Sequence, residues 1–208
     1  MQLAREGYPF VAGGLLLAIV VQFVAGGALA FLCWLIALFM VQFFRDPVRE
    51  IPNDKGAIVS PADGKVVTVR QTTDPVSGKK ATNIAIFLNV FSVHATRIPV
   101  SGEVFQRIYR QGKFLNAAVD KSSEENERNS IVIRTGDDKE VTCIQIAGLI
   151  ARRILCYVTE GQSVQRGERY GFIRFGSRVE LFVPQEYRIT VNVGDKVRGG
   201  ADIIGFMA

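Results

Sequence analysis

Residues that commonly hold metal ions are scarce in this chain. It contains one histidine, His94, and three cysteines, Cys33, Cys143 and Cys156, with no Cys-x-x-Cys pair among them. A structural zinc site needs about four such ligands at close spacing, so the sequence weighs against a metal centre. The cysteines lie in apolar runs, as small buried hydrophobic residues of a reduced compartment do.

Charge is missing from one long stretch near the start of the chain. Residues 8–44 contain no Asp, Glu, Lys or Arg, and their only strongly polar members are Gln22 and Gln42. One helical span needs about 20 residues, so this stretch is too long for a single pass. We expect a membrane hairpin of two short helices in residues 1–44, which either crosses the bilayer or dips into one leaflet.

Cations flank this stretch on both sides. Arg5 precedes it, and Arg45 and Arg49 follow it. Under the positive-inside rule both flanks face the cytoplasm. We therefore expect a protein of the cell (inner) membrane whose main domain lies on the cytoplasmic side.

The rest of the chain, residues 45–208, is mildly basic, with 24 Lys and Arg against 19 Asp and Glu. No run of basic residues is interleaved with aromatics, which weighs against nucleic acid as a partner. A basic domain beside a bilayer is attracted to anionic headgroups, by about 1 kcal/mol for each well-placed cation.

Short β-branched runs separated by glycine turns follow one another from residue 57 onward, which predicts a mainly β domain of packed hairpins or a small barrel. One apolar run, Leu149–Tyr157, predicts a helix. The expected strands are Ala57–Ser60, Lys65–Gln71, Asn83–Leu88, Gly102–Tyr109, Ser130–Thr135, Val141–Ala147, Arg178–Val183 and Thr190–Val193.

Two pairs of segments in this domain echo one another. Pro61–Val66 is repeated by Pro99–Val104, and Gly161–Gly167 by Gly194–Gly200. Such Gly-x-x-Val-x-x-Gly turns resemble the half-repeats of lipoyl and biotinyl carrier domains. The resemblance supplies an alternative function, a non-catalytic membrane-anchored adaptor or carrier, although Lys196 does not lie in a carrier-like hairpin tip.

Three short motifs carry the chemistry. A Gly176-Ser177 step interrupts the strand-like run Arg174–Pro184, His94 lies in Asn-Val-Phe-Ser-Val-His, and Asp63 lies in Ser-Pro-Ala-Asp-Gly-Lys-Val. A Gly-Ser pair alone predicts only a turn. Together and in this order, the motifs resemble the short, bacterial and archaeal form of phosphatidylserine decarboxylase, over roughly residues 40–208.

The resemblance implies a self-cleaving enzyme. The bond between Gly176 and Ser177 would break, giving a large β chain, 1–176, and a small α chain, 177–208, that remain together as a heterodimer; a higher homo-oligomer stays open. Ser177 would become a pyruvoyl group that forms a Schiff base with phosphatidylserine, yielding phosphatidylethanolamine and CO2. The cofactor would be this pyruvate alone, with no metal and no pyridoxal phosphate, and the partner a phospholipid in the membrane.

The residue types suit this chemistry. A glycine before the serine offers an unhindered carbonyl, and the serine supplies both the nucleophile and the oxygen that later leaves. His94 is the one histidine available as a base. Asp63 is the family-matched carboxylate to orient it, with an ordinary Pro-x-Asp-Gly turn as its alternative.

The longer bacterial relatives have two histidines three residues apart, and Arg97 occupies the second position here. Either His94 serves both self-cleavage and decarboxylation, or Arg97, Thr96 or another group takes one task. A polar stretch, residues 111–129, is either a solvated loop or a substrate-contacting one. The resemblance favours contact, and the candidate substrate-binding residues are Arg97, Phe114, Asn126, Glu127 and Arg128.

A third reading is a pyruvoyl decarboxylase of a soluble amino acid. The membrane segment disfavours it, because a soluble substrate gives no reason for an anchor. The three readings differ in one simple observable, since only the enzymes need a break before Ser177.

Overall fold

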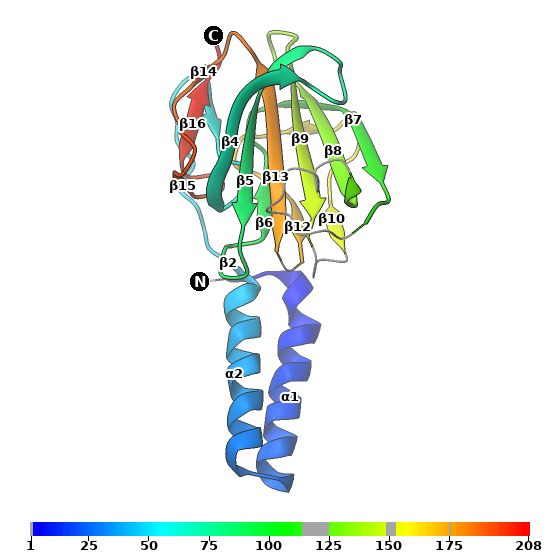
Figure 1. Cartoon of the computed structure of the whole chain (residues 1–208), viewed down its shortest axis with the longest axis vertical. Coiled ribbons are helices and arrows are strands. Elements are labelled where there is room, and N and C mark those ends of the chain that lie inside the picture. Colours follow the sequence, from blue (N-terminus) through cyan, green and yellow to red (C-terminus); the bar gives the residue numbers. More distant parts are fainter. Residues whose placement is uncertain (1, 114–124, 149–152, 175) are drawn as a thin grey trace. The chain divides into compact units, whose positions relative to one another are not determined.

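The computed structural model describes residues 2–113, 125–148, 153–174 and 176–208 (Figure 1). The chain divides into two compact units, Met1–Val48 and Arg49–Ala208. The first is helical and the second is built of strands, which confirms a mainly β fold preceded by a helical hairpin.

The N-terminal unit is a pair of antiparallel helices. A short 3-10 helix, η1 (Arg5–Gly7), leads into α1 (Tyr8–Val24), and α2 (Gly27–Phe43) returns after a turn. Both glycines of that turn have positive φ, 56° for Gly26 and 59° for Gly27, a conformation that side chains disfavour. Strands β1 (Gln2–Leu3) and β2 (Arg45–Asp46) pair at the base of the hairpin.

Small residues line the contact between the two helices, and large ones point outward. Ala18, Ala30 and Ala37 are almost fully buried, whereas Phe23 is 87% and Phe31 66% exposed. By length and composition, Arg5–Val24 is apolar and long enough to cross a membrane, and Gly27–Phe43 is a shorter apolar helix. Exposed apolar side chains on such a helix suit a lipid environment.

The second unit is an antiparallel sheet of eight strands in the order β11-β7-β8-β9-β13-β5-β4-β15, with two three-stranded sheets, β10-β12-β6 and β14-β16-β3. Strand β13 runs through the middle, between β5 and β9 (Figure 1). The strands are β3 (Ala57–Val59), β4 (Gly64–Thr73), β5 (Lys80–Leu88), β6 (Ala95–Arg97), β7 (Gly102–Arg110), β8 (Arg128–Arg134), β9 (Glu140–Ala147), β10 (Ile154–Cys156), β11 (Ser163–Val164), β12 (Arg169–Ile173), β13 (Ser177–Pro184), β14 (Arg188–Ile189), β15 (Lys196–Val197) and β16 (Ile203–Phe206).

The strand order reveals an internal duplication. One half consists of β3 to β5 and β13 to β16, and the other, β6 to β12, is inserted between β5 and β13. Strand β4 pairs with β15 as β7 pairs with β11, with Gly64 opposite Val197 and Gly102 opposite Val164. The sequence echoes therefore mark equivalent strand starts in the two halves.

Hydrogen bonds repeat with the strands. The Val66 amide donates to the Asp195 carbonyl, as that of Val104 donates to Gln162. Strands β4 and β7 each begin with a glycine, and each carries a bulge that starts two residues after it. The halves meet where β9 and β13 pair side by side, so the centre of the sheet is also the boundary of the duplication.

One apolar core fills the space between the eight-stranded sheet and the two small sheets. Ile84 and Leu181 from the large sheet belong to the same buried cluster as Ile58 and Tyr170 from the small ones. Burial of such side chains contributes about 1.5–3 kcal/mol each, and this holds the three sheets together.

Two expected elements were wrong. The helix expected over Leu149–Tyr157 is a strand, β10, where the structure describes it at Ile154–Cys156; residues 149–152 lie outside the described part. A short apolar run does not distinguish a helix from a buried strand, and pairing with β12 decides it here. Thr190–Val193 is not a strand. It follows β14 and leads into a turn in which the Asn192 amide donates to the Asp195 carboxylate.

We predict that Gly102→Ala destabilises the protein. A Cβ at Gly102 would overlap the Arg134 carbonyl oxygen, so the paired backbone must shift, at a cost of about 1–3 kcal/mol. Thermal unfolding in detergent should show a lowered Tm. Gly136→Ala, where nothing lies within 4 Å, is the control and should leave Tm unchanged. Equal Tm values for both variants would contradict the close approach.

Candidate functional site

Ser177 is the first residue of the central strand. It lies opposite Leu88 on one side and Ala147 on the other, so the two neighbouring strands enclose it. Its side chain is fully buried, and its hydroxyl oxygen has no hydrogen-bond partner among the described residues. Leaving a buried polar group unsatisfied costs about 1–3 kcal/mol, which makes this hydroxyl a candidate for chemistry.

Gly176 precedes it in a conformation that favours glycine. Its φ is +65°, although nothing lies within 4 Å of the place where a Cβ would stand. The requirement for glycine is therefore one of backbone conformation and not of space.

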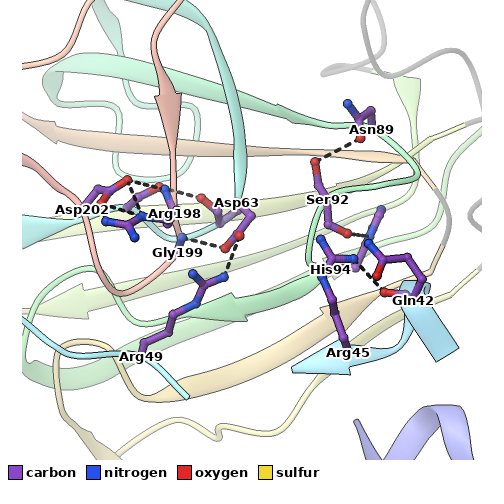
Figure 2. Close-up of polar contacts among 12 residues, drawn as sticks. Gln42, Arg45, Arg49, Asp63, Asn89, Ser92, His94, Arg198, Gly199 and Asp202 are labelled. Atoms are coloured by element: carbon purple, nitrogen blue, oxygen red, sulfur yellow. Dashed lines mark hydrogen bonds and ion pairs between the residues drawn. The ribbon is translucent and has the colours of Figure 1, made fainter. Parts of the chain in front are cut away.

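His94 lies against this glycine. Its side chain is fully buried, and the Gly176 amide donates to its Nε2 at 3.2 Å. On the other side of the ring, Nδ1 lies 2.9 Å from the Ser92 carbonyl oxygen (Figure 2). A carbonyl only accepts and an amide only donates, so these partners fix the neutral tautomer with the proton on Nδ1. Nε2 is thus left unprotonated, as a base requires.

A buried amide, Gln145 of β9, links the strand that follows the histidine to the strand beside the serine. Its Nε2 donates to Thr96 Oγ1 at 2.9 Å and to the Leu155 carbonyl at 3.3 Å. Its Oε1 accepts from Asn129 Nδ2 at 3.0 Å. The bonds of this one side chain join β6, β10, β8 and β9, and so fix the spacing of the strands around the site.

Gly171 makes room for this link. A Cβ there would lie 2.5 Å from Gln145 Nε2 and 2.8 Å from Thr96 Oγ1.

A buried thiol lies next to a buried phenol in the same part of the core: Cys143 Sγ is 3.1 Å from the Tyr170 hydroxyl. Burial raises the pKa of Cys143 to about 12 and that of Tyr170 well above its ordinary value, so both groups are neutral. A neutral, buried thiol is a packing group and not a nucleophile.

Asp63 is held by two other partners. It accepts from Arg49 Nη2 at 2.6 Å and from the Gly199 amide at 2.8 Å. In the second half of the duplication, Ser101 Oγ accepts from the Arg166 amide at 2.9 Å. In both halves, a side-chain oxygen thus accepts a hydrogen bond from a backbone amide of the neighbouring turn. This contact gives Asp63 a structural role of the kind that its turn motif predicts.

The structure does not bring all predicted residues together. Figure 2 draws Asp63 in one group, with Arg49 and Arg198, and His94 in another, with Ser92. Arg97 lies beside the first group: its guanidinium donates to the Gly167 carbonyl, and its Cδ approaches Gly200, the residue after Gly199.

The described part of the polar stretch hydrogen-bonds to the end of β9, the strand next to Ser177. Asn126 Nδ2 donates to the Ala147 carbonyl at 2.7 Å, and the Ala147 amide donates to the Glu127 carbonyl. Burial and a hydrogen bond with Glu127 raise the pKa of Tyr109. Phe114 lies outside the described residues.

A second set of buried charges lies just past the serine. Arg178 Nε and Glu180 Oε1 are 2.8 Å apart, with side chains 1% and 6% exposed. The motifs in the sequence did not identify this pair as part of the site, nor did they identify Gln145 or Ser92. A glutamine within the apolar run 141–147 and two charges in a central strand were the available signals.

The described residues hold no group of three or more His, Cys, Asp or Glu side chains placed to bind a metal. What they do hold is a buried serine after a left-handed glycine, with a neutral histidine against that glycine. Gly176 thus links the two residue types, a serine that follows it in the chain and a histidine that accepts its amide proton.

Comparison with known proteins identifies the family. The model of the phosphatidylserine decarboxylase family matches residues 36–205. Curated phosphatidylserine decarboxylase proenzymes from Aromatoleum aromaticum and Nitrosomonas eutropha are 52% and 50% identical, each over 97% of this chain and 94% of the relative. A third, from Paraburkholderia phymatum, is 51% identical over 97% of this chain and 95% of its own length. The chain therefore belongs to the phosphatidylserine decarboxylase family, whose members by name are carboxy-lyases made as proenzymes.

We predict that Gln145→Leu lowers stability by about 1–3 kcal/mol, because it leaves the amide of Asn129 and the hydroxyl of Thr96 without this buried partner. Urea unfolding monitored by circular dichroism would measure it. Gln106→Leu, at an exposed position of β7, is the matched control and should change the free energy of unfolding little. A Gln145 variant as stable as the control would show that the link is dispensable.

Proposed function

We propose that this chain decarboxylates phosphatidylserine to phosphatidylethanolamine and CO2, with a pyruvoyl group that it makes from Ser177 by cutting the Gly176–Ser177 bond. The observation that carries the proposal is the buried Ser177 hydroxyl, which has no hydrogen-bond partner in the described part of the chain and follows a positive-φ glycine that bonds His94. The relatives' name, proenzyme, agrees with a cleaved product.

The first step is a shift of the acyl group from nitrogen to oxygen. His94 Nε2 takes the proton of the Ser177 hydroxyl, and the oxygen attacks the Gly176 carbonyl carbon. The C–N bond breaks, the Ser177 nitrogen takes the proton, and an ester remains. A left-handed Gly176 leaves its carbonyl free of side-chain crowding during this attack.

The second step removes the Ser177 α-proton. The bond between Cβ and the ester oxygen breaks, and the Gly176 carboxylate leaves as the new end of the large chain. Water then replaces the nitrogen of the dehydroalanine, releasing ammonia and leaving a keto group at the start of the small chain. That keto group supplies the electron sink that decarboxylation of an amino acid requires.

The position of Ser177 suits such a group. Strands β5 and β9 enclose it and bury its side chain, and His94 bonds the amide of the residue before it. We assign substrate contact to the candidates Arg97, Phe114, Asn126, Glu127 and Arg128, which the family resemblance selects.

The two products would stay together. The small chain, 177–208, would contribute β13, which is paired on both sides, and also β15 and β16, which pair with β4 and β3 of the large chain. Separating them would break every one of these ladders, so the cut protein is a heterodimer held by the sheet.

The helical hairpin fits a substrate that remains in a bilayer. Helix α1 is apolar and long enough to cross one, and the cations at residues 5, 45 and 49 favour the cytoplasmic side of the cell membrane. An anchored enzyme meets the phosphatidylserine headgroup at the surface without extracting the lipid.

We predict that Ser177→Ala abolishes both processing and activity. Intact-mass spectrometry of the detergent-purified protein should show two fragments for the wild type, the small one starting at residue 177 and lighter by one ammonia than a serine-initiated chain. The variant should show one uncut chain and release no CO2 from phosphatidylserine micelles. A cut before residue 177 in the variant would contradict the mechanism, and release from free serine but not from the lipid would contradict the substrate.

We predict that His94→Ala slows self-cleavage by about 10²–10⁴-fold, the usual contribution of a positioned base. Pulse–chase gels of the two chains would measure the rate. Asp63→Ser is the informative companion, because serine fastens the equivalent turn in the other half. Unimpaired cleavage in Asp63→Ser together with wild-type Tm would assign Asp63 to the turn, whereas a stable but slow variant would assign its carboxylate to the reaction.

A further inference from the structure

A buried ion pair follows Ser177 directly in the chain. Arg178 Nε and Glu180 Oε1 are 2.8 Å apart, and the two side chains are 1% and 6% exposed. Because side chains alternate along a strand, both lie on the face of the sheet opposite to that of the Ser177 side chain. A buried ion pair is seldom more stabilising than a well-packed apolar pair of similar volume, so its presence here calls for another explanation.

The pair connects three neighbouring strands. Glu180 of β13 lies opposite Ala85 of β5, and Ala85 lies opposite Thr68 of β4. The Arg178 guanidinium contacts both ends of this row: Nε lies against the Glu180 carboxylate, and Nη2 donates to Thr68 Oγ1 at 3.4 Å. A small residue suits the middle of the row, because the guanidinium contacts the residues on both sides of it. Arg178 thus links the start of β13 to β4 across the intervening strand.

The other half of the duplication shows that the fold does not require such a pair. Strand β9 is the counterpart of β13, and Glu140 occupies the position of Arg178. The two residues pair with Arg134 and Phe87, and these in turn pair with the residue directly after the first glycine of β7 and of β4. Glu140 forms an ion pair with Lys79, whose side chain is 64% exposed. The same strand position therefore holds an acidic residue in one half and a buried cation in the other.

The chain also enters the two strands differently. A tight hairpin leads from β8 into β9, and the Thr135 amide closes it on the Lys139 carbonyl at 2.9 Å. The chain that leaves β5 instead runs through the whole inserted half before it returns to β13. After a cut before Ser177, β13 would begin at a free chain end. Ladders hold the body of such a strand, but its first residues fray unless further contacts restrain them.

We propose that Arg178 is a positioning residue for Ser177. In the uncut chain, the peptide before Ser177 restrains this residue from its N-terminal side. Once that peptide is cut, the guanidinium, paired with Glu180 and bonded to Thr68, keeps the start of β13 in place against β5. The keto group made from Ser177 is then fixed without any contact from Arg178 itself. The inference rests on the proposed function, because only a cut chain has this free end.

A comparison of cut and uncut chains tests the proposal. Arg178→Met combined with Glu180→Met removes both charges, so neither is left buried alone. We expect this double variant to cut itself at the wild-type rate. In the cut protein, hydrogen–deuterium exchange at the first amides of β13 should be about tenfold faster than in the wild type, because the strand end opens locally. In a Ser177→Ala background, which stays uncut, the same two substitutions should change the exchange by less than about twofold.

Kinetics separate positioning from a general loss of structure. With phosphatidylserine in mixed micelles, a loosened keto group should lower kcat about tenfold and leave KM within about twofold, because a displacement of about 1 Å is enough to slow a reaction strongly. Thermal unfolding shows whether the double variant has folded. Thr68→Val removes only the far partner of the guanidinium and keeps the side-chain shape, so it gives the same comparison in a chain that retains the ion pair.

Lys139→Met combined with Glu186→Met is the matched control. This pair is also 2.8 Å apart, but both side chains are 47% exposed, and Glu186 follows the other end of β13. We expect it to change neither the exchange at the start of β13 nor kcat.

The outcomes distinguish this role from the proposed reaction. A cut protein in which the Arg178 variant exchanges no faster than the control would overturn the positioning role alone. Faster exchange in a cut protein that releases no CO2 from phosphatidylserine would support the role and contradict the reaction. A wild-type chain that stays uncut would overturn both.

Discussion

The pairing of β13 on both sides is the constraint on which the rest of the site depends. Eight positions of β13 pair with β5 and six with β9. These ladders fix Ser177 at the edge of the core, exclude water from its hydroxyl and leave the peptide before it outside the sheet. They would also hold the strand in place once that peptide is cut, because none of the ladder bonds runs through Gly176.

The duplication explains how one fold builds an asymmetric site. The Ile173 amide donates to the His94 carbonyl just as the Met207 amide donates to that of Gly56, so glycine occupies the histidine's place in the other half. Strand β13, which begins with the serine, comes from one half, and His94, just before β6, comes from the other. The site thus exists only once, at the boundary where the two halves pair.

The sequence predicted the strands with long β-branched runs, the helical hairpin and the repeats, because each has a local periodic signal. It missed short strands such as β6, β11 and β15, which are two or three residues long and form only because a partner strand is present. It selected Ser177 and His94 from motifs, but it could not place Asp63 against Arg49 or Gln145 between β6 and β8. Those contacts join residues far apart in the chain, and nothing local specifies them.

Among the contacts that the structure describes, a carbonyl, that of Ser92, orients the histidine of the proposed reaction, whereas a hydrolase triad uses a carboxylate. A carboxylate stabilises the imidazolium that forms when the base takes a proton, and losing it slows a serine protease by about 10⁴-fold. The Ser92 carbonyl fixes the tautomer but offers less charge. That suffices for self-cleavage, because each chain performs it once and speed is not selected as it is in turnover. A single histidine whose Nδ1 faces a carbonyl is therefore consistent with processing, which makes the cofactor once, whereas each later turnover makes its own demand on speed.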